Sequence, residues 1–267
     1  MTAKTILITG ATDGIGLETA KALAAAGHSL LLHGRSEAKL ASAAEAVAAA
    51  GGTVETFVSD FSVLSSVAAL ADSIAARGAS LDVILNNAGV FKSPVQQTAE
   101  GLDIRIAVNL YAPVVLTRRL LPVLSPDGRI VSLSSAAQAP VSVAAMAGGK
   151  ALSEMDAYAQ SKLALTIWSQ ELAQDLAAGQ VAVAVNPGSL LASKMVQQGF
   201  GVSGGDLQIG VDILSRAALS EEFATANGRY FDNDAGRLAP PHAWAGSAEN
   251  RASVMAAIDT VLARLGL

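Results

Sequence analysis

The stretch Thr5-Ile6-Leu7-Ile8-Thr9-Gly10-Ala11-Thr12-Asp13-Gly14-Ile15-Gly16 decides the fold of this chain. A short apolar run ends in a glycine-rich turn, and a segment with helical spacing follows at 17–26. Glycines in such a turn permit a tight bend and a close approach of the backbone to a pyrophosphate, and the next helix supplies N–H donors from its N-terminus. The spacing G-x-x-x-G-x-G at the first strand–helix junction therefore predicts a dinucleotide site.

Apolar runs of strand length alternate with alanine-rich segments of helical spacing along the rest of the chain. Near-continuous apolar strands are typical of a parallel sheet covered on both faces, and strand–helix alternation favours a doubly wound α/β fold. We therefore predict one Rossmann-type domain over residues 1–267, with a mostly parallel sheet. The predicted strands are 5–9, 29–32, 53–58, 83–85, 129–133, 181–185 and 229–231, and the predicted helices are 17–26, 38–50, 66–76, 104–124 and 152–177.

The composition excludes several classes of function. The chain has 267 residues, of which 51% are hydrophobic, a formal net charge of −5 and no basic run, so nucleic acid is not expected as a partner. It has no cysteine, which excludes disulfides and cysteine–zinc sites, and its three histidines lack ligand spacing, so no metal site is expected. No apolar run reaches the ~18 residues of a membrane span, and the expected location is the cytoplasm.

The second predicted strand ends in His33-Gly34-Arg35-Ser36. An acidic residue at this point would bind the ribose 2′-hydroxyl of NAD, whereas an arginine accommodates the 2′-phosphate of NADP. Arg35 therefore predicts NADP(H) as the cofactor, with NAD as the alternative. Asp13 in the glycine turn argues the other way, because a carboxylate there does not help to hold a second phosphate. An arginine that is merely solvated at a strand end is the other interpretation of Arg35.

Tyr158 and Lys162 are four positions apart on the predicted helix 152–177, so their side chains share one face. A lysine charge beside a phenol lowers a pKa that is ordinarily ~10, which prepares a tyrosine for general acid–base catalysis. An amphipathic helix face whose lysine reaches into solvent is the alternative. The pair Ser134-Ser135 lacks the glycine elbow and the histidine of a hydrolase.

Together these motifs resemble the short-chain dehydrogenase/reductase family over nearly the whole chain. Beyond the glycine turn and Tyr158-x-x-x-Lys162, the matching residues are Asp60-Phe61, Asn86-Asn87-Ala88-Gly89, Asn109, Ser134-Ser135 and Pro187-Gly188. The resemblance implies a catalytic tetrad of Asn109, Ser135, Tyr158 and Lys162. It also implies a cofactor site that consists of Gly10, Thr12, Asp13, Gly14, Ile15, Gly16, Arg35, Asp60, Phe61, Asn87, Ala88, Gly89, Tyr158, Lys162, Pro187 and Gly188.

The resemblance implies hydride transfer between NADP(H) and a small molecule that alternates between carbonyl and alcohol. In this scheme Tyr158 exchanges the proton, Ser135 hydrogen-bonds to the reacting oxygen, Lys162 holds the nicotinamide ribose and Asn109 binds a water. The same fold also serves in regulators that bind a dinucleotide without turnover. Such proteins typically lose the tyrosine or the lysine, whereas this chain has all four tetrad residues, so an oxidoreductase is the preferred interpretation.

A longer segment than is usual in the family separates Ser135 from Tyr158, and the additional residues are 139–156. This length, Arg35 and Gly228-Arg229-Tyr230-Phe231 resemble the retinol-dehydrogenase-like branch. We expect segments 139–156 and 189–245 to form the substrate pocket; for 139–156, a surface excursion without effect is the alternative. After Pro187-Gly188, the stretch that ends at Ser193 shifts the position of the family's usual threonine by one residue. The sequence therefore does not decide which hydroxyl contacts the nicotinamide carboxamide. Apolar walls for a hydrophobic ketone, aldehyde or secondary alcohol are expected from Met146, Met195, Phe200 and Tyr230.

The predicted helices 104–124 and 152–177 carry small residues on several faces. A helix that is apolar on several faces is buried on several sides, and the sheet covers only one of them. In the family these two helices pair with their copies in a four-helix bundle, so the resemblance implies a homodimer or homotetramer. The alternative is a monomer in which the C-terminal segment covers them.

Overall fold

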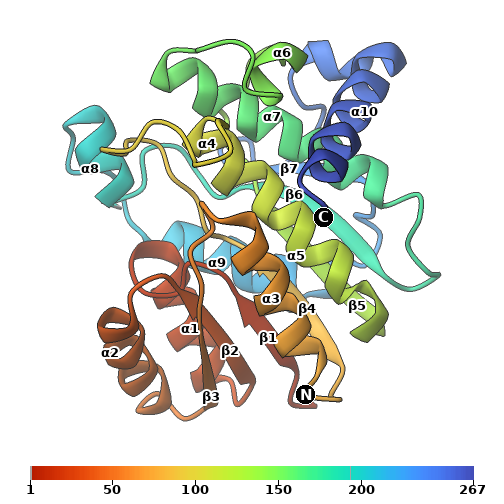
Figure 1. The fold of residues 1–267 in the computed structure, drawn as a ribbon. Coiled ribbons are helices and arrows are strands. Elements are labelled where there is room, and N and C mark those ends of the chain that lie inside the picture. The colour runs from red at the N-terminus through yellow and green to blue at the C-terminus, as the bar shows by residue number, and fades with distance from the viewer. Residues whose placement is uncertain (1, 193) are drawn as a thin grey trace.

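The computed structural model describes residues 2–192 and 194–267, except for the side chains of residues 198–200. One sheet runs through the molecule in the order β3-β2-β1-β4-β5-β6-β7-β8, with helices on both faces (Figure 1). The strand pairs are parallel except for β7 with β8. The strands are β1 (Thr5–Ile8), β2 (Ser29–Gly34), β3 (Thr53–Val58), β4 (Leu81–Asn86), β5 (Leu124–Leu133), β6 (Val181–Asn186), β7 (Arg229–Asp232) and β8 (Arg237–Ala239).

The helices form the two outer layers. The face with α3, α5, α7 and α10 has one hydrophobic cluster, and the face with α1, α2 and α9 has another. Strand order reverses between β1 and β4, and ligands of open α/β sheets bind beyond the carboxyl ends of the strands at such a switch point. The helices are α1 (Gly14–Ala25), α2 (Glu37–Ala48), α3 (Leu64–Ala75), α4 (Ile104–Ile106), α5 (Ala112–Leu120), α6 (Val143–Met146), α7 (Glu154–Leu172), α8 (Lys194–Phe200), α9 (Gln208–Leu219) and α10 (Ala248–Arg264).

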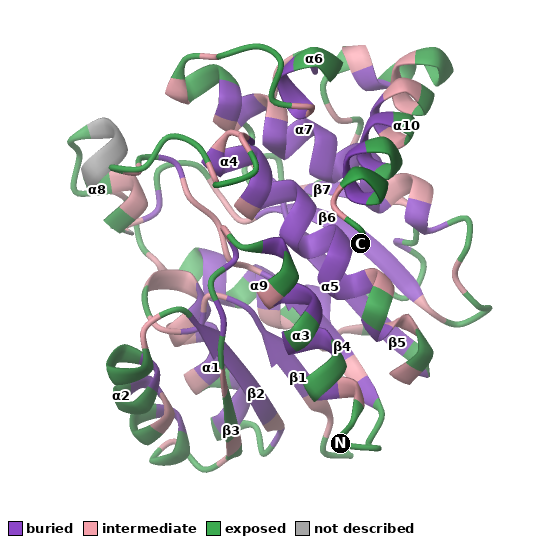
Figure 2. Ribbon diagram, viewed as in Figure 1, coloured by how far each residue is buried: buried purple, intermediate pink, exposed green. Residues whose placement is uncertain are grey.

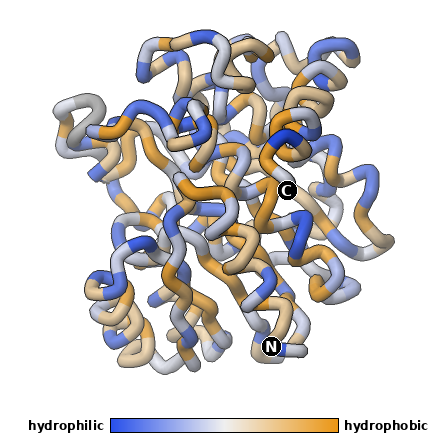
Figure 3. The backbone as a smooth tube through the Cα atoms, in the orientation of Figure 1, coloured by the Kyte–Doolittle hydropathy of each residue, from blue (hydrophilic) through white to orange (hydrophobic). Residues whose placement is uncertain are grey.

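Burial follows the predicted pattern of apolar strands. The central strands are buried on both sides and the outward face of α2 is exposed (Figure 2), while hydrophobic residues follow the strands through the middle of the molecule (Figure 3). The doubly wound fold and its mostly parallel sheet are therefore confirmed. The sequence interpretation missed α6, α8, α9, α10 and β8; α6, α8 and β8 are too short to show a period, whereas α9 carries a helical apolar stripe that was overlooked.

The predicted helix 104–124 is one helical stretch, but its middle is a π-helical turn, Ala107–Tyr111, between α4 and α5. Pro113 has no N–H, so it cannot donate to the carbonyl of Asn109 four residues earlier, as an α-helix requires. The wider turn is bonded instead from the Ala112 N–H to the Ala107 carbonyl. Among the described residues, Ile104–Val123 is also the one stretch long and apolar enough to cross a membrane, and 67% of its most apolar window is buried inside the protein.

The C-terminal helix α10 covers helix surface that the sequence analysis expected a second copy of the chain to cover. It packs on α6 and α7, and Ile258 and Val261 join the same hydrophobic cluster as α5 and α7. An ion pair of 2.8 Å between Arg118 and Asp259 ties it to α5. The small residues of α5 and α7 therefore find cover within one chain, which removes the burial argument for an oligomer.

Candidate active site

The glycine turn is fixed against the residues that follow β4. A Cβ on Gly10, whose φ is 67°, would lie 2.8 Å from the Ala88 Cα, and a Cβ on Gly16 would lie 2.3 Å from the Asn87 Nδ2. That amide nitrogen donates to the carbonyls of Thr9 at 2.8 Å and Gly10 at 3.1 Å. Two predicted cofactor segments, Gly10–Gly16 and Asn87–Gly89, therefore meet, and only glycine permits the contact.

Asp13 has two partners in the structure. Its carboxylate caps α1 by accepting from the Gly14 N–H at 2.9 Å, and it forms an ion pair with Lys194 at the start of α8. The positive charge of Lys194 offsets the carboxylate of Asp13, which in the sequence argued against binding of a second phosphate. A hollow of about 400 Å³ opens beside this pair, between the turn and α2, and Lys39 lines it as well.

Arg35 is exposed one residue beyond the end of β2. Gly34 brings that end close to the glycine turn, because a Cβ there would lie 2.4 Å from the Thr12 methyl carbon. Asp60 is also exposed, and its carboxylate accepts from the N–H and the hydroxyl of Ser62 at 2.9 Å and 2.8 Å. Of Gly34, Arg35 and Asp60, Gly34 is the one whose contact with the glycine turn is direct.

The sequence analysis missed His33, which joins these segments. Its Nδ1 accepts from the Gly10 N–H at 3.3 Å, its Nε2 lies 3.0 Å from the Ser59 carbonyl, and its ring stacks on Phe61 at 4.0 Å between centroids. Burial lowers the pKa of His33 to about 4. The neutral ring therefore donates from Nε2 and accepts at Nδ1. Phe61 packs in the core against this ring.

The residues predicted as catalytic meet at the carboxyl end of β5. Tyr158 and Lys162 come from α7, and the Tyr158 phenol faces the side chain of Ser135 closely enough for that hydroxyl to lower its pKa. The Lys162 Nζ lies 5.7 Å from the centroid of the Tyr158 ring and donates to the Leu133 carbonyl at 2.6 Å. Burial lowers the pKa of Lys162 to about 8. A phenol, a hydroxyl and an amine thus share one small site.

The expected direction of the Tyr158 pKa is wrong for the structure as described. Burial raises the pKa of the phenol, and the nearby Ser135 hydroxyl lowers it in part. Sequence spacing shows that Lys162 shares the face, but not how strongly the protein desolvates both groups. Tyr158 is therefore protonated at neutral pH, which suits a proton donor.

Asn109 is engaged through its side chain. Its Oδ1 accepts from the Val90 N–H at 2.8 Å, and its Nδ2 donates to the Val90 carbonyl and to the Ser161 hydroxyl, both at 3.0 Å. The side chain thus ties the segment after β4 to α7. The group available to a water is the main-chain carbonyl of Asn109, since Pro113 has no N–H for it.

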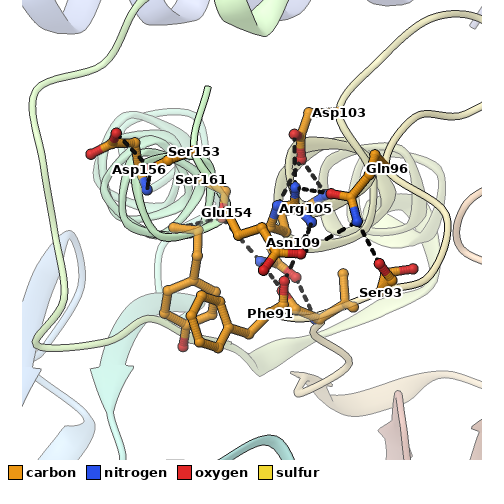
Figure 4. A network of polar contacts seen from close by, with 12 residues as sticks. Phe91, Ser93, Gln96, Asp103, Arg105, Asn109, Ser153, Glu154, Asp156 and Ser161 are labelled. Atoms are coloured by element: carbon orange, nitrogen blue, oxygen red, sulfur yellow. Dashed lines mark hydrogen bonds and ion pairs between the residues drawn. The ribbon is translucent and has the colours of Figure 1, made fainter. Parts of the chain in front are cut away.

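Arg105, one turn before Asn109, is buried and pins the same segment (Figure 4). Its guanidinium donates to the side chains of Gln96 at 2.6 Å and Asp103 at 3.3 Å, and to the Phe91 carbonyl at 3.4 Å. The Phe91 ring packs against the Tyr158 ring with centroids 5.2 Å apart. No sequence motif indicated this buried cation, which holds an aromatic neighbour of the catalytic tyrosine in place.

The Pro187-Gly188 turn is held from the end of β7. The Asn186 side chain donates to Asp232 and to Asp234, both at 2.9 Å, and the Asn233 side chain donates to the Pro187 carbonyl at 2.9 Å. The sequence analysis did not single out these three residues after Tyr230-Phe231. Their contacts run between segments far apart in sequence, so only the fold reveals them.

Gly89 lies among these groups. A Cβ there would lie 3.4 Å from the Asn109 Oδ1, 3.5 Å from the Lys162 Nζ and 3.8 Å from the Met195 Cε. The side chain of Met195, from α8, therefore lies near Lys162 and Asn109. This position is compatible with the prediction that Met195 forms an apolar wall of the pocket. Leu190, with a φ of 51°, has a left-handed backbone, and Ser193 and the Phe200 side chain lie outside the described residues.

Two other predicted pocket walls are placed differently. Met146 is 1% exposed and packs in the hydrophobic core, and Tyr230 is 4% exposed with its hydroxyl bound to a backbone carbonyl. Neither forms an open wall, because long-range packing and hydrogen bonds decide where these side chains point. Both corrections remove apolar surface from the expected pocket.

The segment 139–156 is anchored at several points. It contains the short helix α6, which packs on α10. The Tyr111 hydroxyl donates to the Met146 carbonyl at 3.0 Å, and the Ser142 N–H donates to the Gln160 side chain at 2.9 Å. Val143 of α6 is 41% exposed.

Comparison with known proteins agrees with this geometry. The family model described as short chain dehydrogenase matches residues 4–200. The chain belongs to the short-chain dehydrogenase family. It is 36% identical to retinol dehydrogenase 12 of Bos taurus over 204 residues, which cover 74% of this chain and 64% of that protein. It is 31% identical to retinol dehydrogenase 12 of Mus musculus over 86% of this chain and 78% of that protein, which confirms the retinol-dehydrogenase-like branch.

Solved structures share the fold of this short-chain dehydrogenase. An uncharacterized protein from Mycobacterium paratuberculosis is 28% identical with a TM-score of 0.79, covering 97% of this chain and 92% of that one. A short-chain dehydrogenase from Shigella flexneri, crystallised with NADP, is 27% identical with a TM-score of 0.70 over 88% of this chain and 98% of that one. A metagenomic short-chain oxidoreductase in complex with NADP is 29% identical with a TM-score of 0.65, covering 84% and 95%.

Proposed function

We propose that the protein is an NADP(H)-dependent oxidoreductase that interconverts a carbonyl and an alcohol on an apolar small molecule. The observation that carries this proposal is the meeting of Ser135, Tyr158 and Lys162 at the end of β5, with Gly89 beside the Lys162 amine. The neighbouring glycine turn and the N-terminus of α1 fit a pyrophosphate. When bound there, the nicotinamide cofactor supplies or accepts the hydride.

The side chains of this site divide the remaining work in reduction. Tyr158 is protonated at neutral pH and donates its phenolic proton to the carbonyl oxygen. Ser135, whose side chain faces that phenol, donates a hydrogen bond to the same oxygen and fixes its position. Lys162 is fixed by the Leu133 carbonyl and lies on the side where the nicotinamide ribose is expected. In oxidation the proton moves the other way: the phenolate form of Tyr158, which alkaline pH favours, takes the proton of the alcohol.

The preference for NADP(H) over NAD(H) is supported by local charge. Arg35 is exposed at the end of β2, and Lys39 and Lys194 line the hollow beside the glycine turn. The ion pair with Lys194 offsets the carboxylate of Asp13. Cations in this position favour a ligand with an additional phosphate.

An apolar substrate is supported by Met195 beside Gly89 and by relatives named for apolar alcohols, retinol and polyprenol. The test measures NADPH consumption by the purified protein with a panel of apolar ketones and aldehydes, and measures NADPH binding by fluorescence. Turnover with at least one carbonyl compound is expected. NADPH binding without turnover across the panel would favour the alternative, a regulator of the same fold.

A further inference from the structure

The main-chain carbonyl of Ser135 is clamped by two side chains. The Tyr230 hydroxyl donates to it at 3.2 Å, and the Gln138 Nε2 donates to it at 2.9 Å. Ser135 lies two residues beyond the end of β5, where strand pairing does not fix the backbone. Its own Oγ accepts from the Ala137 N–H at 3.1 Å. The position of that Oγ therefore depends on the backbone that the two donors hold.

Tyr230 is a rigid donor. It lies in β7, which pairs with β6 on one side and with β8 on the other, and its side chain is 4% exposed. Burial, and then the charges of Asp232 and Asp234, raise the pKa of its phenol far above the ordinary value. Its hydroxyl therefore keeps its proton at any working pH and has one acceptor to serve.

Gln138 is itself oriented by a third segment. Its Oε1 accepts from the main-chain N–H of His242 at 2.8 Å, which turns the amide nitrogen toward Ser135. Two segments from the C-terminal third of the chain thus converge on one carbonyl, one directly and one through Gln138.

We infer that Tyr230 is a positioning residue: its hydroxyl fixes the carbonyl of Ser135, and thereby the Oγ that faces the Tyr158 phenol and donates to the reacting oxygen. The inference rests on the proposed function, because it concerns the same reaction. It assigns Tyr230 a role in place of the apolar wall that the sequence suggested.

The first test is Tyr230→Phe, which removes one oxygen and keeps the ring. We expect kcat for carbonyl reduction to fall about tenfold, the effect of one lost hydrogen bond on a catalytic group, with NADPH affinity unchanged. The control is Thr53→Val, which also removes one hydroxyl and its hydrogen bond, 2.8 Å to the Ser29 hydroxyl, at the amino ends of β2 and β3, the edge of the sheet opposite the site. Its kcat should stay at the wild-type value. Wild-type kcat in Tyr230→Phe, or an equal loss in both variants, would overturn the inference.

A pH profile separates positioning from a general structural effect. In the substrate-free enzyme the Ser135 hydroxyl lowers the pKa of the Tyr158 phenol that it faces, and reduction requires the protonated phenol. When Ser135 is less well placed, that pKa rises, so the alkaline limb of kcat/KM, which reports the substrate-free enzyme, moves to higher pH in Tyr230→Phe. A reduced kcat with an unmoved alkaline limb would contradict the inference. Gln138→Leu removes the other donor and should shift the limb in the same direction.

The dependence on Ser135 is tested by a double-mutant cycle. In the Ser135→Ala background the positioned hydroxyl is absent, so adding Tyr230→Phe should change the residual kcat by less than about twofold. Equal losses in both backgrounds would show that Tyr230 acts elsewhere and would overturn the inference alone. Wild-type kcat in Ser135→Ala would overturn the proposed function, and the inference with it.

Discussion

Replacing His33 with glutamine is expected to remove a pH-dependent part of the protein's stability. The ordinary pKa of 6.5 holds in the unfolded chain, and burial lowers the pKa in the folded protein to about 4. Between these values the unfolded chain binds more protons, so the free energy of unfolding falls as pH decreases from 6.5 to 4. The difference between the two pKa values corresponds to about 3 kcal/mol of unfolding free energy. This stability is fully present above pH 6.5 and is lost near pH 4.

The measurement is urea unfolding of wild type and His33→Gln at several values of pH across this window. The variant lacks the imidazole, so its stability deficit relative to wild type should shrink by about 3 kcal/mol on acidification. Comparison of the two proteins cancels the acidic groups that titrate in both. His242→Gln, at an exposed histidine, controls for the removal of an imidazole. A deficit that stays constant with pH would refute the assignment of a buried, neutral His33.

Three further outcomes are expected. Arg35→Ala should weaken NADPH binding about ten- to a hundredfold, the worth of a charge-assisted contact, and leave NADH nearly unchanged; equal weakening of both would contradict the NADP(H) assignment. Val143→Ser, at an exposed position of α6, should shift the ratio of kcat/KM between a bulky and a small carbonyl substrate about tenfold, and a constant ratio would make the segment 139–156 a surface excursion. Light scattering should give a monomer of 26.9 kDa, because α10 covers α7; two or four times that mass would confirm the homodimer or homotetramer that the sequence predicts.

The parts of the site that depend on local sequence were predictable. The glycine turn is set by steric needs at Gly10 and Gly16, which only glycine meets, and the turn follows directly from a strand. Tyr158 and Lys162 share a face because helical spacing requires it. The alternation of continuous apolar runs with helical segments also predicted the doubly wound sheet, because the strands of a buried parallel sheet are apolar along their whole length.

The parts that depend on contacts between distant segments were not predictable. His33 and Tyr230 read as strand residues, yet each binds a backbone group of a site segment from another strand end. The pKa of Tyr158 depends on how much protein surrounds it, which spacing does not specify. The cover that α10 gives to α7 likewise follows only from the folded chain.

The central claim is that Tyr158 is the proton donor of a carbonyl reductase. Its most direct test is the turnover of Tyr158→Phe with NADPH and a carbonyl substrate, together with NADPH binding to the same protein. The change deletes one oxygen and keeps the ring against Phe91, so the fold and the cofactor affinity should persist. We expect kcat to fall by at least ~10²–10⁴, the contribution of general acid catalysis. Turnover at the wild-type rate would contradict the account.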